Sequence, residues 1–133
     1  MDYQAYVDAM QRVSEQVDAQ QYDDALAGLR TLLDSDLLDA DKAVLCINMA
    51  VVHDKLGKTS EALAWYDRGI DYERAYRRHM VAESKAAYLY AGGRGAEALS
   101  LYESLVRERS LGEAEKQRLA HNVESLRAEL AKR

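Results

Sequence analysis

The sequence predicts an all-α protein built from about three consecutive helical hairpins and one final helix. Apolar residues recur at three- and four-residue spacing along most of the 133 residues, which is the period of a helix. Three similar segments contain Ala25, Ala62 and Ala98, which are 37 and then 36 residues apart. A repeat of this length is typical of stacked helical hairpins, because one hairpin cannot bury its apolar faces alone.

The first hairpin is predicted from two helical patterns, over residues 3–19 and 22–34. One side of the first pattern carries Tyr3, Tyr6, Val7, Met10, Val13 and Val17. The run Asp34-Ser35-Asp36 then breaks the pattern, since these residues favour turns over helix interiors. Leu37 and Leu38 follow the break, and we expect them to pack on the hairpin.

The central hairpin, residues 40–56 and 60–72, is the clearest of the three. Its first helix has two apolar faces and must therefore be covered on two sides. Gly57 ends that helix, because glycine adopts the left-handed C-terminal conformation at little cost. Thr59 or Ser60 is expected to cap the next helix, with Glu61 near its positive end.

The third hairpin is expected over residues 76–91 and 95–109, with a turn at residues 92–95. Residues 73–78 contain no helix breaker, so a continuous helix across this boundary is an alternative. Ser110 and Glu113 match a capping box, and a last helix follows over about 112–131. We expect it to cap the repeats; docking in a groove or between protomers stays open.

The three similar segments resemble the tetratricopeptide repeat family. The matching positions are Met49, Ala50, His53, Gly57, Ala62, Tyr66 and Gly69 in the central copy, Ala86, Leu89, Gly93, Ala98 and Tyr102 in the third, and Tyr22, Ala25 and Leu32 in the first. The resemblance covers about residues 5–107. No proline closes a repeat, and Lys85 stands at a usual leucine position.

The resemblance implies a right-handed superhelical stack within one domain, residues 1–133. Its repeats would span about 5–38, 42–74 and 76–109, followed by a capping helix over about 112–131. In that family the first helices of the hairpins line a concave face that holds an extended peptide or a helix.

When the three repeats are aligned on their shared alanines, the concave face of the family indicates which residues would bind a partner. They are Met10, Ser14, Val44, Ile47, Asn48, Val51, Lys55, Met80, Glu83, Ala87 and Tyr90. Most are apolar, so the groove should favour an amphipathic helix or an apolar extended peptide. Asn48 stands where family members often hydrogen-bond the ligand backbone, and its carboxamide offers both donor and acceptor. The alternative is that the apolar side chains belong to the core or are covered by the last helix.

Composition narrows the classes of function. A formal net charge of −5 argues against a nucleic-acid binder, whose affinity depends on neutralising phosphates. No stretch has the length of a membrane span, and the first residues do not read as a signal peptide. The single cysteine, Cys46, cannot form an internal disulfide and fits a reducing compartment. We therefore expect a cytoplasmic protein.

No residue pattern predicts catalysis, a metal or a cofactor. The glycines at 92–95 follow a helix rather than a strand and lack the lysine of a phosphate loop. His53, His79 and His121 are isolated from one another, and Cys46 has no base beside it. We expect His53 and Cys46 to be packing residues and the protein not to be an enzyme.

Charge is unevenly distributed along the chain. Residues 1–40 carry nine acidic and two basic residues, whereas residues 41–133 carry fourteen and sixteen. Arg74, Arg77 and Arg78 form a basic cluster. This asymmetry supports an alternative function, self-association in which the acidic N-terminal region of one copy meets the arginines of another. Solvated faces without a partner are the simpler explanation.

Overall fold

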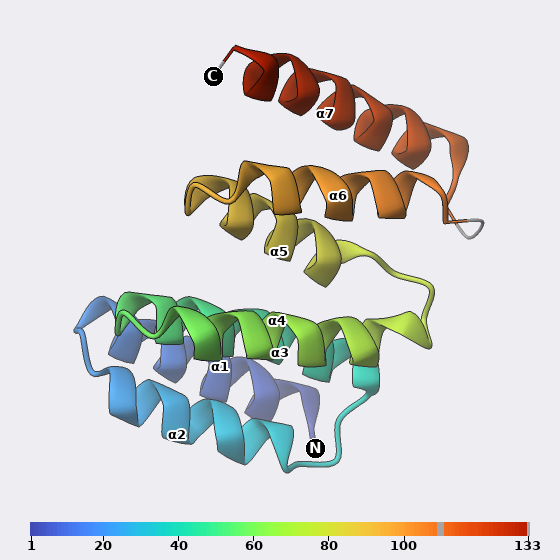
Figure 1. Cartoon of the computed structure of the whole chain (residues 1–133). Coiled ribbons are helices and arrows are strands. Elements are labelled where there is room, and N and C mark those ends of the chain that lie inside the picture. The colour runs from blue at the N-terminus through green and yellow to red at the C-terminus, as the bar shows by residue number, and fades with distance from the viewer. Residues whose placement is uncertain (109–110, 133) are drawn as a thin grey trace. The chain divides into compact units, whose positions relative to one another are not determined.

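The computed structural model describes residues 1–108 and 111–132, and every regular element in these residues is an α-helix. The all-α prediction is therefore confirmed (Figure 1). The helices are α1 (Tyr3–Asp18), α2 (Tyr22–Leu33), α3 (Asp39–Lys55), α4 (Thr59–Arg74), α5 (Met80–Ala91), α6 (Gly95–Val106) and α7 (Glu113–Ala131). Their contacts group the chain into two compact units, residues 1–76 and 77–133, which we call unit 1 and unit 2. The single domain and the handedness of its stack stay predictions.

Unit 1 contains two hairpins, α1–α2 and α3–α4, joined through packing of α2 on α3. Its core consists of side chains from the first three helices: Val13, Ala25, Leu26, Leu29, Leu32, Leu33, Leu45, Cys46, Met49 and Val52. Trp65 and Tyr72 of α4 pack against this core. At Gly28 a side chain would approach Val13 to 3.2 Å, so α1 and α2 pack closely there.

Unit 2 consists of the hairpin α5–α6 and the C-terminal helix α7, which packs on α6. Leu119, Val123 and Leu126 are the buried residues of α7, and they lie at helical spacing as the sequence predicts. At Gly95, the first residue of α6, a Cβ atom would lie only 2.8 Å from Leu130 Cδ2. The absence of a side chain at Gly95 therefore allows α7 to approach the start of α6.

The three hairpin turns have the same backbone geometry. Each contains one residue with positive φ: Gln20 (61°), Gly57 (75°) and Gly93 (81°). The N–H group of the next residue donates to the carbonyl five positions earlier: Gln21 to Gln16 (2.8 Å), Lys58 to His53 (2.9 Å) and Arg94 to Leu89 (2.8 Å). This is the hydrogen bond of a Schellman motif. The positive-φ residues are 37 and 36 residues apart, the same spacing as the fully buried Ala25, Ala62 and Ala98.

Several local predictions are wrong. Helix α5 begins at Met80 rather than at residue 76, because Arg77 adopts φ 54° and interrupts the helix. The same residue excludes the continuous helix that residues 73–78 allowed. Neither Thr59 nor Ser60 caps α4: its N-cap is Lys58, because the hairpin turn starts the helix directly after Gly57.

At the other ends, α6 ends at Val106, short of the predicted residue 109. The predicted capping box includes Ser110, which lies outside the described residues. Helix α7 begins at Glu113, after Gly112 in the N-cap position. Of the two leucines after α2, Leu37 packs against the core, whereas Leu38 is 66% exposed.

Candidate functional site

The predicted partner-binding residues divide between the two units. Helices α1 and α3 of unit 1 carry Met10, Ser14, Val44, Ile47, Asn48, Val51 and Lys55, and helix α5 of unit 2 carries Met80, Glu83, Ala87 and Tyr90. The structure describes each unit by itself. Within each unit we therefore ask which side chains are exposed and which already have partners.

In unit 1 the predicted residues differ in exposure. Met10 packs against the core, and Val44 and Ile47 are half-buried. Val51 is 39% exposed, and Ser14 and Lys55 are exposed as well. Only the outer part of the predicted set is therefore free to meet another molecule.

Asn48 lies one helical turn before Val52 on α3 and is half-buried. In the part of the chain that the structure describes, its carboxamide makes no hydrogen bond. A half-buried amide without an internal partner can bind a peptide group with both its oxygen and its nitrogen. Its role as a ligand contact stays a prediction.

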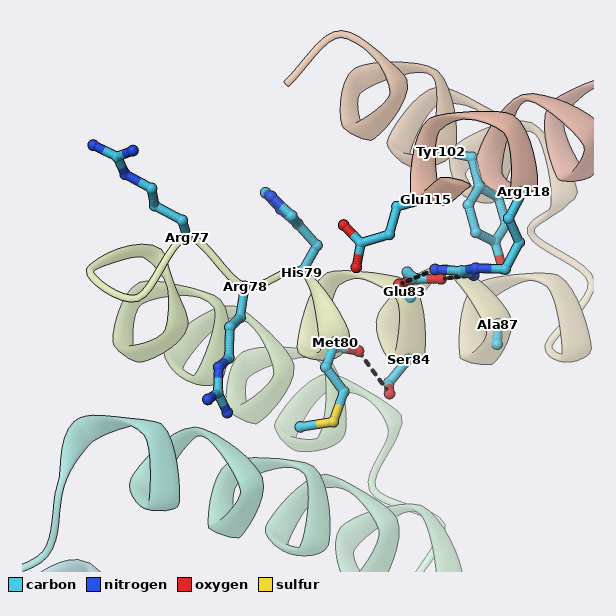
Figure 2. A pocket seen from close by; sticks show the side chains of 10 residues that line it. All are labelled: Arg77, Arg78, His79, Met80, Glu83, Ser84, Ala87, Tyr102, Glu115 and Arg118. Atoms are coloured by element: carbon cyan, nitrogen blue, oxygen red, sulfur yellow. Dashed lines mark hydrogen bonds and ion pairs between the residues drawn. The ribbon is translucent and has the colours of Figure 1, made fainter. Parts of the chain in front are cut away.

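In unit 2, three of the four predicted residues line one pocket of about 650 Å³. Met80, Glu83 and Ala87 come from successive turns of α5, and Met80 is 45% exposed. The other lining residues are Arg77, Arg78, His79, Ser84, Tyr102, Glu115 and Arg118 (Figure 2). The volume is in the range of pockets that hold a small ligand or a few peptide side chains.

Two regions of the pocket differ in character. Arg77, Arg78 and His79 lie along the segment that leads into α5, where Figure 2 shows the two arginine side chains extending in different directions. Tyr102 of α6 and Arg118 of α7 lie on the opposite side, beside Glu83. The pocket thus has a basic entrance and a partly apolar wall, formed by Met80 and Ala87.

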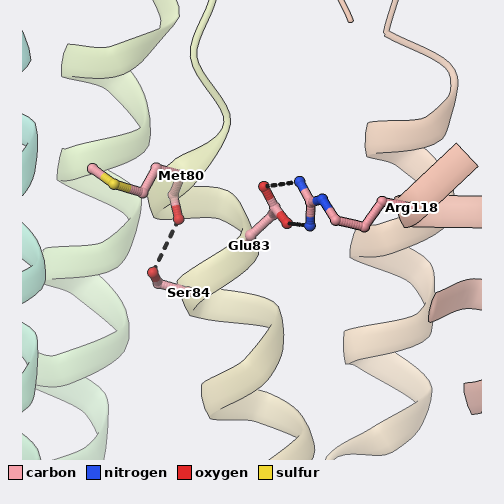
Figure 3. Close-up of polar contacts among 4 residues, drawn as sticks. All are labelled: Met80, Glu83, Ser84 and Arg118. Carbon is pink, nitrogen blue, oxygen red and sulfur yellow. Dashed lines mark hydrogen bonds and ion pairs between the residues drawn. The ribbon is translucent and has the colours of Figure 1, made fainter. Parts of the chain in front are cut away.

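The C-terminal helix already engages α5 through polar side chains. Arg118 donates to both carboxylate oxygens of Glu83, at 2.5 Å and 3.1 Å, in a bidentate ion pair (Figure 3). This hydrogen bond and the charge of Glu83 raise the pKa of Arg118. Tyr90 donates its hydroxyl to Glu129 of α7. Two predicted ligand contacts, Glu83 and Tyr90, therefore have partners within unit 2.

The sequence does not predict Arg118 and Glu115 as pocket residues, because it predicts α7 mainly as a cap and names no residue for the alternative in which this helix covers the groove. The signal that could have found them is the spacing, since Arg118 follows Glu83 by 35 residues, close to the repeat period. By this spacing α7 occupies the place of the first helix of a further copy. The sequence predicts Tyr102 only as a repeat position. In the structure it lines the pocket, and burial and the nearby charge of Glu83 raise the pKa of its phenol.

The two residues predicted to be packing residues are buried. Cys46 is completely buried, and burial raises the pKa of its thiol to about 11. His53 is 5% exposed and stacks on Trp65 at 6.5 Å between ring centroids; among the described residues neither ring nitrogen has a hydrogen-bond partner. Burial lowers the pKa of this imidazole, and the charge of Lys58 lowers it further. Neither side chain has the exposure that a catalytic nucleophile or base needs.

Within residues 1–108 and 111–132, no three histidine, cysteine or acidic side chains come close enough together to hold a metal ion. Among the same residues, no helix combines the length and apolar character needed to cross a membrane.

Comparison with known proteins gives no relative: no family model, no curated protein and no solved structure matches this chain.

Proposed function

We propose that the chain is a cytoplasmic protein–protein interaction module, of the tetratricopeptide repeat type, that binds a partner segment along the first helices of its hairpins. The observation that carries the proposal is the turn geometry repeated at Gln20, Gly57 and Gly93. The repeated turn gives each hairpin equivalent positions along its own first helix. Repeat proteins use such surfaces to hold extended ligands.

The exposed side chains support a segment with apolar anchors. Val51 of α3 and Met80 of α5 are large, apolar and well exposed on the helices from which binding is proposed. Exposed methionine adapts its shape to different apolar partners at low cost. Asn48 would add a hydrogen bond to the partner's backbone.

The test is selection of short peptides that bind the full chain from a displayed library, followed by calorimetric titration of the selected peptides. We expect Val51→Asp and Met80→Asp to weaken binding at least about tenfold, since each places a charge against an apolar anchor. Asn48→Ala should weaken it several-fold. Ala64→Asp is the matched control, because Ala64 is also exposed but lies on α4, a second helix. Equal binding by all four variants would contradict the proposal.

A second candidate function is self-association, and the charge of the two units favours it. Unit 1 carries fifteen acidic and seven basic residues, a formal charge of −8. Unit 2 carries eight acidic and eleven basic residues, a formal charge of +3. Opposite charge on two parts of one chain favours contact between unlike parts of two copies.

A further inference from the structure

The loop between α2 and α3 exposes an apolar side chain among carboxylates. We call residues 34–39 the acidic loop; they read Asp-Ser-Asp-Leu-Leu-Asp. Asp34, Asp36 and Asp39 are exposed, and Leu38 between them is 66% exposed. The adjacent Leu37 packs against the core instead, which anchors the loop so that Leu38 points outward.

The structure explains why the acidic loop has this form. The carbonyl of Leu38 accepts the first hydrogen bonds of α3, from the N–H groups of Asp41 and Lys42, so Leu38 occupies the N-cap. A leucine side chain cannot cap a helix, so helix formation does not explain its presence there. Asp39 in the first turn does favour the helix. The N-terminal ammonium group of Met1 donates to the backbone carbonyl of Asp36 at 3.3 Å. The side chains of Asp34 and Asp36 have no ion pair within the described residues, so their carboxylates are available to a partner.

The entrance of the unit 2 pocket has the complementary charge; deeper in the pocket Glu83 is paired with Arg118, and Glu115 is a second carboxylate. Arg77 and Arg78 at its entrance are exposed and have no ion pair in the described parts of the chain. Met80 and Ala87 provide an apolar wall behind them. Arg77 is held at φ 54°, a conformation that costs a non-glycine residue energy and that often occurs at binding sites.

We propose that this pocket binds the acidic loop of a second copy of the chain. Leu38 of the second copy would contact Met80 and Ala87, while Asp34 and Asp36 pair with Arg77 and Arg78. The proposal rests on the second candidate function and names its two surfaces. Each copy carries both the loop and the pocket, so a pair of copies that closes about a two-fold axis makes two identical contacts.

The apolar anchor distinguishes this proposal from simple attraction between charges. Exposed ion pairs contribute little on their own, so aspartates and arginines would not hold two copies together without Leu38. The charges instead select the loop and speed its approach, and they are screened by salt. A pocket of about 650 Å³ has room for one leucine side chain and the backbone on either side of it.

The experiment is sedimentation velocity of the full chain over a range of protein and salt concentrations. We expect a concentration-dependent dimer at low salt whose dissociation constant rises at least about tenfold in high salt. Asp36→Lys, which reverses a loop charge, and Arg78→Glu, which reverses a pocket charge, should each give a monomer, because a reversal places like charges against each other, which costs far more than the loss of an exposed ion pair. Asp18→Lys is the matched control, because Asp18 is an exposed acidic residue of unit 1 outside the loop, and this variant should dimerise like the parent.

Mixing gives the sharper result. A chain with Asp36→Lys retains an intact pocket, and a chain with Arg78→Glu retains an intact loop. The mixture should therefore form a heterodimer with one parental contact and one in which the two reversed charges again have opposite sign, although each variant alone is monomeric. Leu38→Asp in the otherwise unchanged chain should also abolish the dimer, and circular dichroism of each variant establishes that it is folded.

Three outcomes would overturn the proposal: a monomer at all concentrations in low salt, loss of the dimer with Asp18→Lys, or no heterodimer on mixing. A synthetic peptide with the sequence of residues 33–40 separates this proposal from the first candidate function. If the peptide binds the parent but not Arg78→Glu while the chain stays monomeric, the pocket binds segments of another protein and the second copy is excluded. If the chain stays monomeric and neither the loop peptide nor the library peptides bind, both proposals fail.

Discussion

The repeated turn makes a quantitative prediction about backbone strain. Gly57 and Gly93 occupy the left-handed region, and a Cβ atom at either position would meet no atom within 4 Å. Replacement by alanine therefore adds no clash, and its cost comes from the backbone alone. A residue with a side chain pays roughly 1–2 kcal/mol in this region, and glycine loses somewhat more chain entropy on folding. We expect Gly57→Ala to lower the free energy of unfolding by about 1 kcal/mol.

The first hairpin allows the reverse experiment. Gln20 occupies the same position in its turn at φ 61°, so it already pays this cost. Gln20→Gly should raise the free energy of unfolding by about 0.5–1 kcal/mol. Combined in one chain with Gly57→Ala, it should bring the stability back near that of the parent, because both turns belong to unit 1 and lie in separate hairpins.

Urea denaturation followed by fluorescence is a suitable assay, because Trp65 is the only tryptophan and lies in unit 1. The matched control is Gly92→Ala, monitored by circular dichroism. Gly92 precedes Gly93 in the third turn, its φ of −84° suits any residue, and an added Cβ atom would lie at an ordinary 3.4 Å from the Tyr88 carbonyl oxygen. The equivalent position of the first turn is already an alanine, Ala19. We expect this control to be neutral or slightly stabilising. If Gly57→Ala were as harmless as Gly92→Ala, or if Gln20→Gly were destabilising, the strain argument would be wrong.

Two further predictions concern buried groups of unit 1. Burial lowers the pKa of His53 below its ordinary 6.5. Just below pH 6.5 the unfolded chain therefore binds more protons than the folded chain. The free energy of unfolding is retained above pH 6.5 and falls as the pH drops toward the folded-state pKa. The difference between the urea midpoints at pH 7.5 and 5.5 measures this loss. His53→Phe should make that difference smaller, and it should also stabilise the unit by about 1 kcal/mol at neutral pH, because it removes a buried polar group that has no partner among the described residues. The thiol of Cys46, with a pKa of about 11, should react with an alkylating reagent at pH 8 only through unfolding. Rapid labelling of Cys46 without denaturant would contradict its burial.

The sequence predicted the all-α fold and the repeat because these depend on local signals. Gly57 and Gly93 mark left-handed turns, and Ala25, Ala62 and Ala98 mark the tight packing that follows each turn. Helix starts were predicted less well. Lys58 and Leu38 are N-cap residues without side-chain caps, since the turn or the preceding loop determines where the helix begins.

The candidate site was predicted only in part, because a repeat period identifies positions but not what covers them. Met80 and Ala87 line a pocket as residues of the predicted face, whereas Glu83 and Tyr90 are already bound by side chains of α7. An ion pair between residues 35 positions apart on different helices depends on how far their long side chains reach. Helical periodicity contains no information about that reach.

The two leucines after α2 show which signal matters for function. Leu37 and Leu38 are identical in the sequence pattern, yet Leu37 packs against the core and Leu38 is exposed. Core packing accounts for the first, but neither packing nor helix capping accounts for the second. An exposed leucine beside unpaired carboxylates is explained more economically by a contact that a single copy of the chain does not make. If Leu38→Ser left both self-association and peptide binding unchanged, the exposed leucine would belong with the isolated apolar residues that are common on protein surfaces.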